Sequence, residues 1–340
     1  GGLTTEWETA LNNYMTLGGS NISKYLHWYG VDGMGYNSEF SNYSTTFMND
    51  LRTLHADLVR EGKKVNSIFE NIWYDGTNDN GVIQFDLGLA GHNYKNFGDS
   101  NDPRTSLFFN YNWNRLDLDA SASKATSMGR DPHDLYCGMN MQGGEPNNTP
   151  WPKLLASKLS IGLWGAHDRN MFWESRGELG SEEETKQRAY LLRTERFYTG
   201  GTRNPANAPA VREGWFGYNA NNTSFSGLSP FRSAQSTLSW DLSTEPFITY
   251  FNIGNGKFFN LNGYRASNNH WVNVGMQDYL PTWRFWFATS LLGGNSSDVP
   301  SGGLDAEFVW DDAYFGGSSL RIFGSHSNEY LHLFKTKYEL

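Results

Sequence analysis

The residues best suited to chemistry in this sequence are an amide and an acid two positions apart, Asn37 and Glu39, at the end of an octet that spans residues 32–39. The octet follows an apolar, aromatic run at 25–31 that has the composition of a buried strand. In an extended chain alternate side chains project to one face, so the two groups would point together, about 6.6 Å apart along the backbone. The sequence therefore predicts a strand over 25–31, with an acid and an amide that share one face beyond its carboxyl end.

Such a pair suits cleavage of a glycosidic bond next to a sugar that carries a 2-acetamido group. An acid at position 39 can protonate the leaving oxygen, while the acetamide oxygen of the substrate attacks the anomeric carbon in place of a second carboxylate. An amide at position 37 would hold that acetamide in place. Neither position 35 nor position 37 is an acid, which favours substrate-assisted catalysis over the usual pair of carboxylates.

Strand-like and helical segments alternate along the first half of the chain, as is typical of βα units around a parallel sheet. A helical period over 3–17 precedes the first strand, and a second helix is predicted over 44–62. Further apolar runs, each ending in polar or aromatic residues, lie at 67–75, 106–113, 134–142 and 160–167. This gradient is typical of a (β/α)8 barrel, whose active site lies at the carboxyl ends of its strands.

The sequence yields five such strands, whereas a barrel of this class needs eight. Only one helix fits upstream of Tyr25, so we expect the first three βα units to be absent from this chain and to lie in an amino-terminal segment of the same protein. Short apolar runs separated by Gly and Ser are typical of antiparallel strands, and they lie at 306–310, 319–323 and 330–334. The predicted organisation is α/β: an incomplete (β/α)8 TIM-barrel catalytic domain at 1–283 and the start of a β-sandwich domain at 284–340.

Composition favours a carbohydrate ligand. Aromatic residues make up 16% of the chain, and such rings stack on the apolar C–H faces of sugars. The net charge of −9, without a basic cluster, argues against nucleic acid. No pair of histidines has metal-ligand spacing, so neither a metal nor a cofactor is expected.

The single cysteine, Cys137, excludes an intrachain disulfide framework. No apolar stretch reaches the roughly 18 to 20 residues of a membrane span. The first residues do not have the pattern of a signal peptide. We expect a secreted or cell-surface protein whose signal region is not in this chain.

Several segments resemble, in the same order, those of glycoside hydrolase family 85, the endo-β-N-acetylglucosaminidases. They are Asp-Gly-x-x-x-Asn-x-Glu at 32–39, Trp-Tyr-Asp at 73–75, Phe-Phe-Asn-Tyr-Asn-Trp at 108–113, and the segments at 246–256, 277–283 and 315–320. The resemblance implies a mannosyl-glycoprotein endo-β-N-acetylglucosaminidase. Such an enzyme cleaves the GlcNAc-β1,4-GlcNAc chitobiose core of N-linked glycans on glycoproteins or glycopeptides and leaves one GlcNAc on the protein.

The resemblance also implies roles for single residues. Glu39 would be the general acid and later the base, Asn37 would orient and polarise the acetamido group as an oxazoline forms, and Tyr74 would hydrogen-bond that group. Trp113 would lie beside the reacting sugar. Phe85 stands where the family has a tryptophan.

Other strand ends offer candidates for sugar contacts, and these are Asn110, Gln142, Trp164 and His167. Trp73 alternates with Tyr74 and should therefore face the surrounding helices. Gly35 stands where the family motif would have a bulky residue.

Two other interpretations stay open. A family 18-like chitinase or endoglycosidase also uses the substrate acetamide, but it normally carries Asp-Gly-x-Asp-x-Asp-x-Glu, and here Gly35 and Asn37 replace two of those acids. The other is a non-catalytic glycan-binding protein, which the missing strands make plausible.

Overall fold

The computed structural model describes residues 5–111, 113, 115–141, 150–165, 183–202, 209–212, 224, 226–231, 238–239, 249–273, 276–277, 286–288, 296–297, 303–325, 327–333 and 336–337. The chain divides into two compact units. Unit 1 comprises Gly1–Asn140, Pro146–Trp164 and Arg212–Trp215, and unit 2 comprises Met141–Glu145, Gly165–Val211 and Phe216–Leu340.

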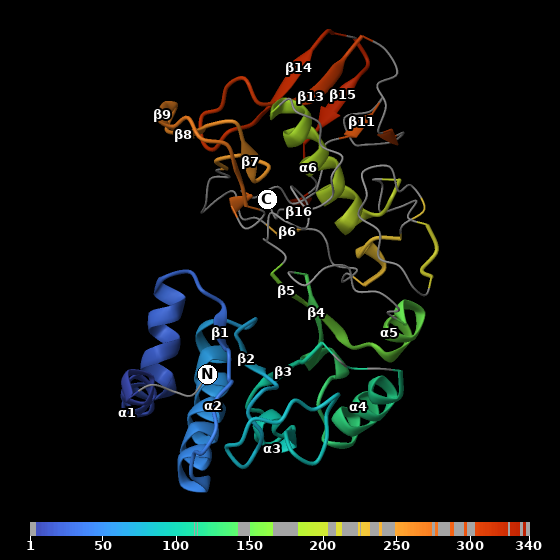
Figure 1. Cartoon of the computed structure of the whole chain (residues 1–340). Coiled ribbons are helices and arrows are strands. Elements are labelled where there is room, and N and C mark those ends of the chain that lie inside the picture. Colours follow the sequence, from blue (N-terminus) through green and yellow to red (C-terminus); the bar gives the residue numbers. More distant parts are fainter. Residues whose placement is uncertain are drawn as a thin grey trace. The chain divides into compact units, whose positions relative to one another are not determined.

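Unit 1 is built on a parallel sheet with the strand order β1-β2-β3-β4-β5. The strands are β1 (Gly33–Tyr36), β2 (Glu70–Tyr74), β3 (Ser106–Phe109), β4 (Leu135–Asn140) and β5 (Ser160–Trp164). The sheet is curled, with helices between its strands, and it has the form of a partial (β/α)8 barrel (Figure 1). The predicted α/β class is confirmed, as are the four strands predicted after the first.

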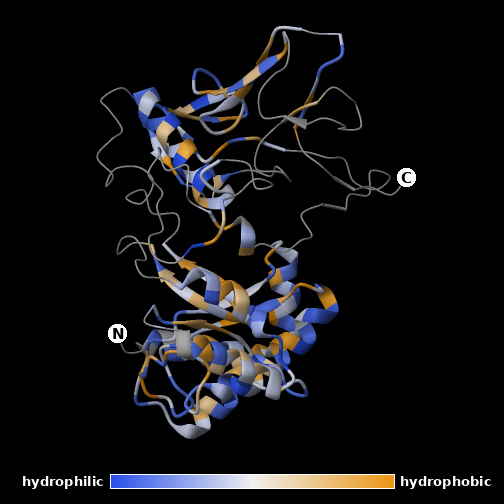
Figure 2. Ribbon diagram, turned by 90° about the vertical axis from the view of Figure 1, so that its right-hand side faces the viewer, coloured by the Kyte–Doolittle hydropathy of each residue, from blue (hydrophilic) through white to orange (hydrophobic). Residues whose placement is uncertain are grey.

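The helices of unit 1 are α1 (Thr5–Trp28), α2 (Thr45–Val65), α3 (Tyr94–Phe97), α4 (Arg115–Ser127) and α5 (Trp151–Ser157). The predicted second helix is confirmed as α2, which begins after Ser44, whose side chain caps the helix by accepting a hydrogen bond from the N–H of Phe47. Hydrophobic segments alternate with hydrophilic ones along the helices of unit 1, as expected of helices with one buried face (Figure 2). In the described part of the chain, no helix combines the length and apolar character needed to cross a membrane.

The strand predicted over 25–31 is wrong, because these residues form the end of α1 and the turn after it. Tyr25, Trp28 and Tyr29 are 61%, 77% and 59% exposed, so the run is also not buried. A short apolar run cannot be assigned to helix or strand by periodicity alone, and this one continues the helix that the sequence predicts only to residue 17. The true first strand escaped notice because two of its four residues are glycine, and its pairing with β2 overrides that weak propensity.

A glycine pair explains how α1 packs closely on α2. Gly18 interrupts α1 with a φ of 75°, a conformation that glycine adopts without strain. The N–H of Gly19 donates to Oδ2 of Asp57 in α2 at 2.5 Å. A Cβ at position 19 would lie 2.5 Å from the backbone carbon of Asp57, so only glycine allows this approach.

The parallel register assigns strand residues to an inner and an outer face. Gly35 pairs with Ile72, and Tyr74 pairs with Phe108. Paired residues share a face and side chains alternate, so these four positions line the inner face of the curled sheet. Asn37 directly follows Tyr36, the last paired residue of β1, and alternation assigns it to the same inner row.

The outer face packs against α2. Tyr36 pairs with Trp73 across β1 and β2, and the ring of His55 in α2 lies 4.9 Å from the Tyr36 ring and 5.3 Å from the Trp73 ring, measured between centroids. Trp73 is 1% exposed, which confirms the prediction that it faces the helices. Burial of these rings fixes which side chains of β1 and β2 can point inward.

Unit 2 contains α6 (Glu183–Thr199) and short, mainly antiparallel strands. The antiparallel pairs are β13 (Asp305–Val309) with β14 (Ser319–Phe323), β11 (Trp286–Ala288) with both β12 (Ser296–Ser297) and β15 (Tyr330–His332), β8 (Phe259–Leu261) with β9 (Tyr264–Ser267), and β7 (Asn255–Gly256) with β10 (Trp271–Val272). A parallel pair joins β6 (Leu238–Ser239) to β16 (Thr336–Lys337).

The core of unit 2 contains Ile253, Phe287, Phe308 and Trp310. The three antiparallel strands predicted near the carboxyl end are confirmed as β13, β14 and β15. A β-sandwich domain starting at residue 284 stays a prediction.

His55 is an ionisable group inside the apolar contact between α2 and the sheet. It is 1% exposed, and neither ring nitrogen has a hydrogen-bond partner among the described residues. Burial, with a further contribution from the charges of Arg52 and Arg104, lowers the pKa of His55 from 6.5 to about 3. The folded protein therefore holds this ring neutral at pH values where the unfolded chain protonates it.

We predict that His55 makes unit 1 sensitive to acid. The stabilising effect of its low pKa is complete above pH 6.5 and is lost as the pH falls toward 3, because the unfolded state then binds a proton that the folded state excludes. The free energy of unfolding should fall by about 1.4 kcal/mol per pH unit from this group. Urea denaturation between pH 7 and 4.5 should show a smaller slope in both His55→Phe and His55→Gln. Equal slopes in the variants and the wild-type protein would contradict the assignment.

Candidate active site

The candidate site begins where β1 ends. Asn37 is exposed, whereas Glu39 is half-buried between Ser38 and Phe40, which are 1% and 5% exposed. The N–H of Glu39 donates to the carbonyl oxygen of Asn37 at 3.0 Å, so the chain turns at Ser38. The extended backbone predicted through these residues therefore stops at Asn37, and Glu39 is presented by a turn.

The hydroxyl of Tyr74, at the end of β2, has two hydrogen-bond partners. The side-chain amide of Asn110 donates to it at 2.8 Å, and the phenol of Tyr111 is its second partner. This bond raises the pKa of Tyr111 and lowers that of Tyr74. Two side chains therefore hold the Tyr74 hydroxyl in place at the end of β2.

The charge of Glu39 acts on both phenols. Burial raises the pKa of Tyr74, and the nearby Glu39 carboxylate raises it further. Burial likewise raises the pKa of Tyr111, and Glu39 again adds to the shift. Both tyrosines are therefore protonated hydrogen-bond donors at neutral pH, and Glu39 lies close enough to influence each of them.

Gly76 keeps open the space between Glu39 and Phe85. A Cβ at position 76 would lie 3.3 Å from Cγ of Glu39 and 3.3 Å from Cε1 of Phe85. The Phe85 ring is 42% exposed, and its centroid lies 6.0 Å from that of Tyr74. An acid, a phenol and an exposed aromatic ring thus lie close together around Gly76. This arrangement suits a sugar whose face stacks on the ring while the acid protonates its glycosidic oxygen.

A second carboxyl near Tyr74, that of Asp75, cannot reach a ligand. Asp75 is 0% exposed, and its Oδ2 accepts a hydrogen bond from the amide of Asn93 at 3.1 Å. Burial raises the pKa of Asp75 well above its ordinary value. Of the two carboxyls whose charges act on Tyr74, only that of Glu39 is accessible.

The remaining predicted residues are less closely gathered. Trp113 is half-buried, and its indole N–H donates to the carbonyl oxygen of Gly138 in β4 at 2.8 Å. Trp164 is 43% exposed at the end of β5. Gln142 and His167 lie outside the described residues, so their roles stay predictions.

Sequence reasoning missed four residues that shape this site, and these are Ser38, Gly76, Thr77 and Tyr111. These residues act on the backbone or on Tyr74 rather than on a ligand, and Gly76 does so through the absence of a side chain. No catalytic motif therefore identifies them. Tyr111 had a usable signal, because it lies next to Asn110 at the end of a predicted strand.

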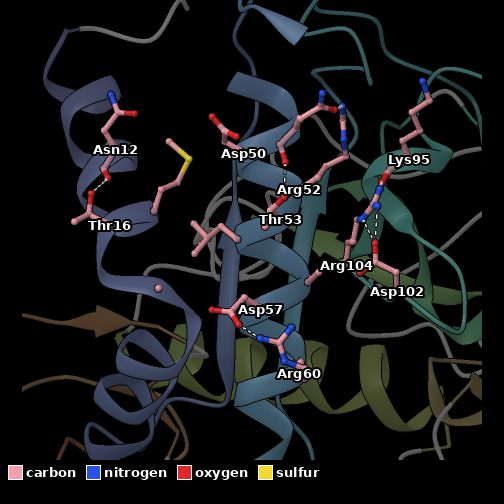
Figure 3. Close-up of a pocket in the computed structure, with 15 residues that line it drawn as sticks. Asn12, Thr16, Asp50, Arg52, Thr53, Asp57, Arg60, Lys95, Asp102 and Arg104 are labelled. Carbon is pink, nitrogen blue, oxygen red and sulfur yellow. Dashed lines mark hydrogen bonds and ion pairs between the residues drawn. The ribbon is translucent and has the colours of Figure 1, made fainter. Parts of the chain in front are cut away.

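No group of three or more His, Cys, Asp or Glu side chains in the described residues could hold a metal ion. A groove of about 1150 Å³ lies between α1, α2 and α3, and none of the candidate residues lines it (Figure 3). Its charges are largely paired with one another, as in the ion pairs Arg60–Asp57 and Arg104–Asp102. We therefore place the candidate active site at the strand ends and not in this groove.

We predict that Gly76→Ala disturbs the site by crowding. The added methyl group would lie 2.5 Å from the carbonyl oxygen of Ser38 as well as against Glu39 and Phe85. Overpacking of this kind costs about 1–3 kcal/mol, and urea denaturation should show a loss of that size. Gly91→Ala is the matched control, because a Cβ at this exposed glycine would meet nothing within 4 Å. Equal stability of the two variants would refute the close contact at Gly76.

Two comparisons with known proteins bear on this arrangement. The sequence profile described as Glycosyl hydrolase family 85 matches residues 21–259, which include every candidate residue. The chain is also similar to the crystal structure of the glycoside hydrolase domain of Endo-D from Streptococcus pneumoniae R6, with 24% sequence identity and a TM-score of 0.60. That similarity covers 94% of this chain and 47% of the other, so this chain spans about half the length of that protein.

No curated protein matches the chain significantly. The structural similarity, at this level of identity, supports the barrel fold and no more. The family profile is stronger evidence of relationship, because it covers more than half of the sequence, from α1 to β8. This chain therefore belongs to glycosyl hydrolase family 85.

Proposed function

We propose that the chain is an endo-β-N-acetylglucosaminidase that cleaves the GlcNAc-β1,4-GlcNAc core of N-linked glycans by retaining, substrate-assisted catalysis. The observation that carries this proposal is the composition of the site around Tyr74. One accessible acid, Glu39, lies with an amide, Asn37, at the same strand end, and the second nearby carboxyl, Asp75, is fully buried. A site with one usable carboxyl suits a reaction in which the substrate supplies its own nucleophile.

In the first step Glu39 donates its proton to the glycosidic oxygen while the acetamide oxygen attacks the anomeric carbon. The glycosidic bond breaks, the reducing-end GlcNAc leaves with the protonated oxygen, and an oxazolinium ring forms on the glycan fragment that stays in the site. Asn37 accepts from the acetamide N–H and favours its imidic form, and Tyr74 hydrogen-bonds the same group. In the second step the Glu39 carboxylate takes a proton from water, which opens the oxazoline with net retention of configuration.

Aromatic and amide side chains around the strand ends would bind the sugars. Phe85, beside Glu39, offers an exposed ring for stacking, and Trp164 offers a second at the end of β5. Trp113 and Asn110 would support these contacts, because the Trp113 indole donates to the carbonyl oxygen of Gly138 and the Asn110 amide donates to the hydroxyl of Tyr74. Gln142 and His167 would complete the contacts.

The proposed substrates are N-linked glycans of glycoproteins or glycopeptides, which implies a secreted or cell-surface site of action. The proposed complement to the five strands is an amino-terminal segment of the same protein that contributes three further βα units. The support for this proposal is the barrel class, which has eight strands, whereas the described residues form a parallel sheet of five.

The experiment that tests the proposal is mass spectrometry of a ribonuclease-type glycoprotein before and after incubation with the protein. Loss of all but one core GlcNAc is the expected result. Cleavage of chitin oligomers in preference to a high-mannose glycopeptide would favour a family 18-like activity instead. Binding of the glycan without release of a product would identify a non-catalytic glycan-binding protein.

We predict that Glu39→Gln lowers the rate of glycan release by about 10²- to 10⁴-fold, because the amide cannot donate a proton to the leaving oxygen. The variant should unfold at the same temperature as the wild-type protein, because the carboxyl makes no hydrogen bond to a described residue. Release of glycan from the glycopeptide is the measurement. Glu8→Gln, an exposed change in α1, is the control. Unchanged turnover in Glu39→Gln would show that Glu39 is not the general acid.

We predict that Asn37→Ala and Asn37→Gln fail to hydrolyse the natural glycan and still process a preformed sugar oxazoline. The amide is needed to orient the acetamide during ring formation, and that step is already complete in the oxazoline. Glu39 remains available as the base for the second step. Parallel assays with glycopeptide and oxazoline should show loss of the first activity only. Equal loss of both would contradict the role of Asn37.

A further inference from the structure

We infer that Thr77 is a positioning residue for the acid, because its side-chain hydroxyl holds the backbone on both sides of Glu39. The inference rests on the proposed function, since it concerns how the general acid is presented. Thr77 lies in the loop after β2 and is separated from the Glu39 turn by 38 positions in the sequence. It makes no direct contact with the proposed substrate, because it is 0% exposed.

Three short contacts converge on Oγ1 of Thr77. It accepts a hydrogen bond from the N–H of Phe40 at 2.9 Å. It also lies 2.9 Å from the carbonyl oxygen of Ser38 and 2.7 Å from that of Phe40, and it donates to these carbonyls. A hydroxyl carries one hydrogen, so the two carbonyls share one donor while the amide supplies the acceptor bond.

The residues that Thr77 hydrogen-bonds are the immediate neighbours of Glu39. The side chains of Ser38 and Phe40 are buried, and Glu39 alone of the three is partly exposed. Ser38 is fixed a second time, because its hydroxyl donates to the carbonyl oxygen of Tyr74. The turn therefore presents Glu39 toward Tyr74 with its backbone tied to the end of β2.

Thr77 is itself held firmly. Its carbonyl oxygen accepts a hydrogen bond from the indole N–H of Trp73 at 3.2 Å, and it forms a bridge with Ile83 across the loop. Trp73 in turn packs on His55 and Tyr36 of the outer face. The turn that carries Glu39 is therefore fixed, through Thr77, relative to the buried side chain of Trp73.

Loss of the hydroxyl would leave buried backbone groups without partners. The N–H of Phe40 and the carbonyl oxygen of Ser38 both hydrogen-bond the Thr77 hydroxyl, and an unsatisfied buried group is costly enough to make the turn shift. A displacement of about 1 Å in a catalytic group can lower the rate about 100-fold. Proton donation by Glu39 should therefore suffer while the sugar contacts remain.

The test compares Thr77→Val, which keeps the shape and removes the hydroxyl, with Thr77→Ser, which keeps the hydroxyl. Thr105→Val is the matched control, because Thr105 is 1% exposed, donates to the carbonyl oxygen of Asn96 at 2.9 Å and precedes β3 at the opposite end of the sheet. Each variant is assayed at a temperature where its unfolding curve shows it folded. Two substrates are used: a natural glycopeptide, and a glycan whose reducing-end GlcNAc is replaced by nitrophenol.

Nitrophenol leaves without help from an acid, so the ratio of the two rates reports proton donation rather than the fraction of folded protein. We expect Thr77→Val to lower kcat for the glycopeptide about 100-fold and for the nitrophenyl substrate less than about 10-fold, with KM changed less than about threefold. Glu39→Gln should change the ratio in the same direction. Thr77→Ser and Thr105→Val should keep the wild-type ratio.

Equal losses on both substrates in Thr77→Val would overturn the inference, as would the same change of ratio in Thr105→Val or a failure of Thr77→Ser to restore the ratio. A wild-type protein inactive on both substrates would refute the proposed function instead. In that event amide hydrogen exchange still tests whether Thr77 holds the backbone on both sides of Glu39. The N–H of Phe40 should exchange at least about 10-fold faster in Thr77→Val than in the wild-type protein, and an unchanged exchange rate would show that Thr77 does not hold the turn.

Discussion

The parallel pairing of β1 with β2 is the interaction on which the rest of the site depends. It sets Tyr36 opposite Trp73, and both rings pack against α2. Alternation then assigns the next residue, Asn37, to the inner face. A slip of one residue would exchange the two faces, sending Tyr36 inward and Asn37 into the core. The burial of two aromatic rings on the outer face therefore determines the chemistry that is possible on the inner one.

Some polar groups of the site hold other residues in place, and others are available to bind a substrate. Asn110 and Tyr111 hydrogen-bond the Tyr74 hydroxyl and so hold it in place. Ser38 and Thr77 are committed to backbone groups near Glu39. Such pre-organisation matters in catalysis, because a group already aligned does not spend free energy on reorientation during the reaction.

Periodicity and composition predicted most of the sheet and little of the detail within the site. The strands at 67–75, 106–113, 134–142 and 160–167 were identified because they are buried, apolar and end in polar residues, and they correspond to β2 through β5. The first strand was misplaced because Gly33 and Gly35 carry no propensity signal and the aromatic run before them is an exposed helix end. The support given by Thr77 depends on a contact between two loops, which local sequence patterns do not encode. Chemistry and family resemblance predict Asn37 and Glu39 as site residues, and that stays a prediction, whereas the turn that presents Glu39 is seen only in the structure.

The central claim is that the substrate's own acetamido group is the nucleophile. The most direct measurement is a crystal structure of the protein with a stable analogue of the sugar oxazoline. The account predicts that the ring derived from the acetamide lies between the carboxamide of Asn37 and the hydroxyl of Tyr74, with the Glu39 carboxyl on the side of the leaving group and no other carboxylate within reach of the anomeric carbon. A carboxylate in position to attack that carbon, or an acetamido group turned away from Asn37, would contradict the account.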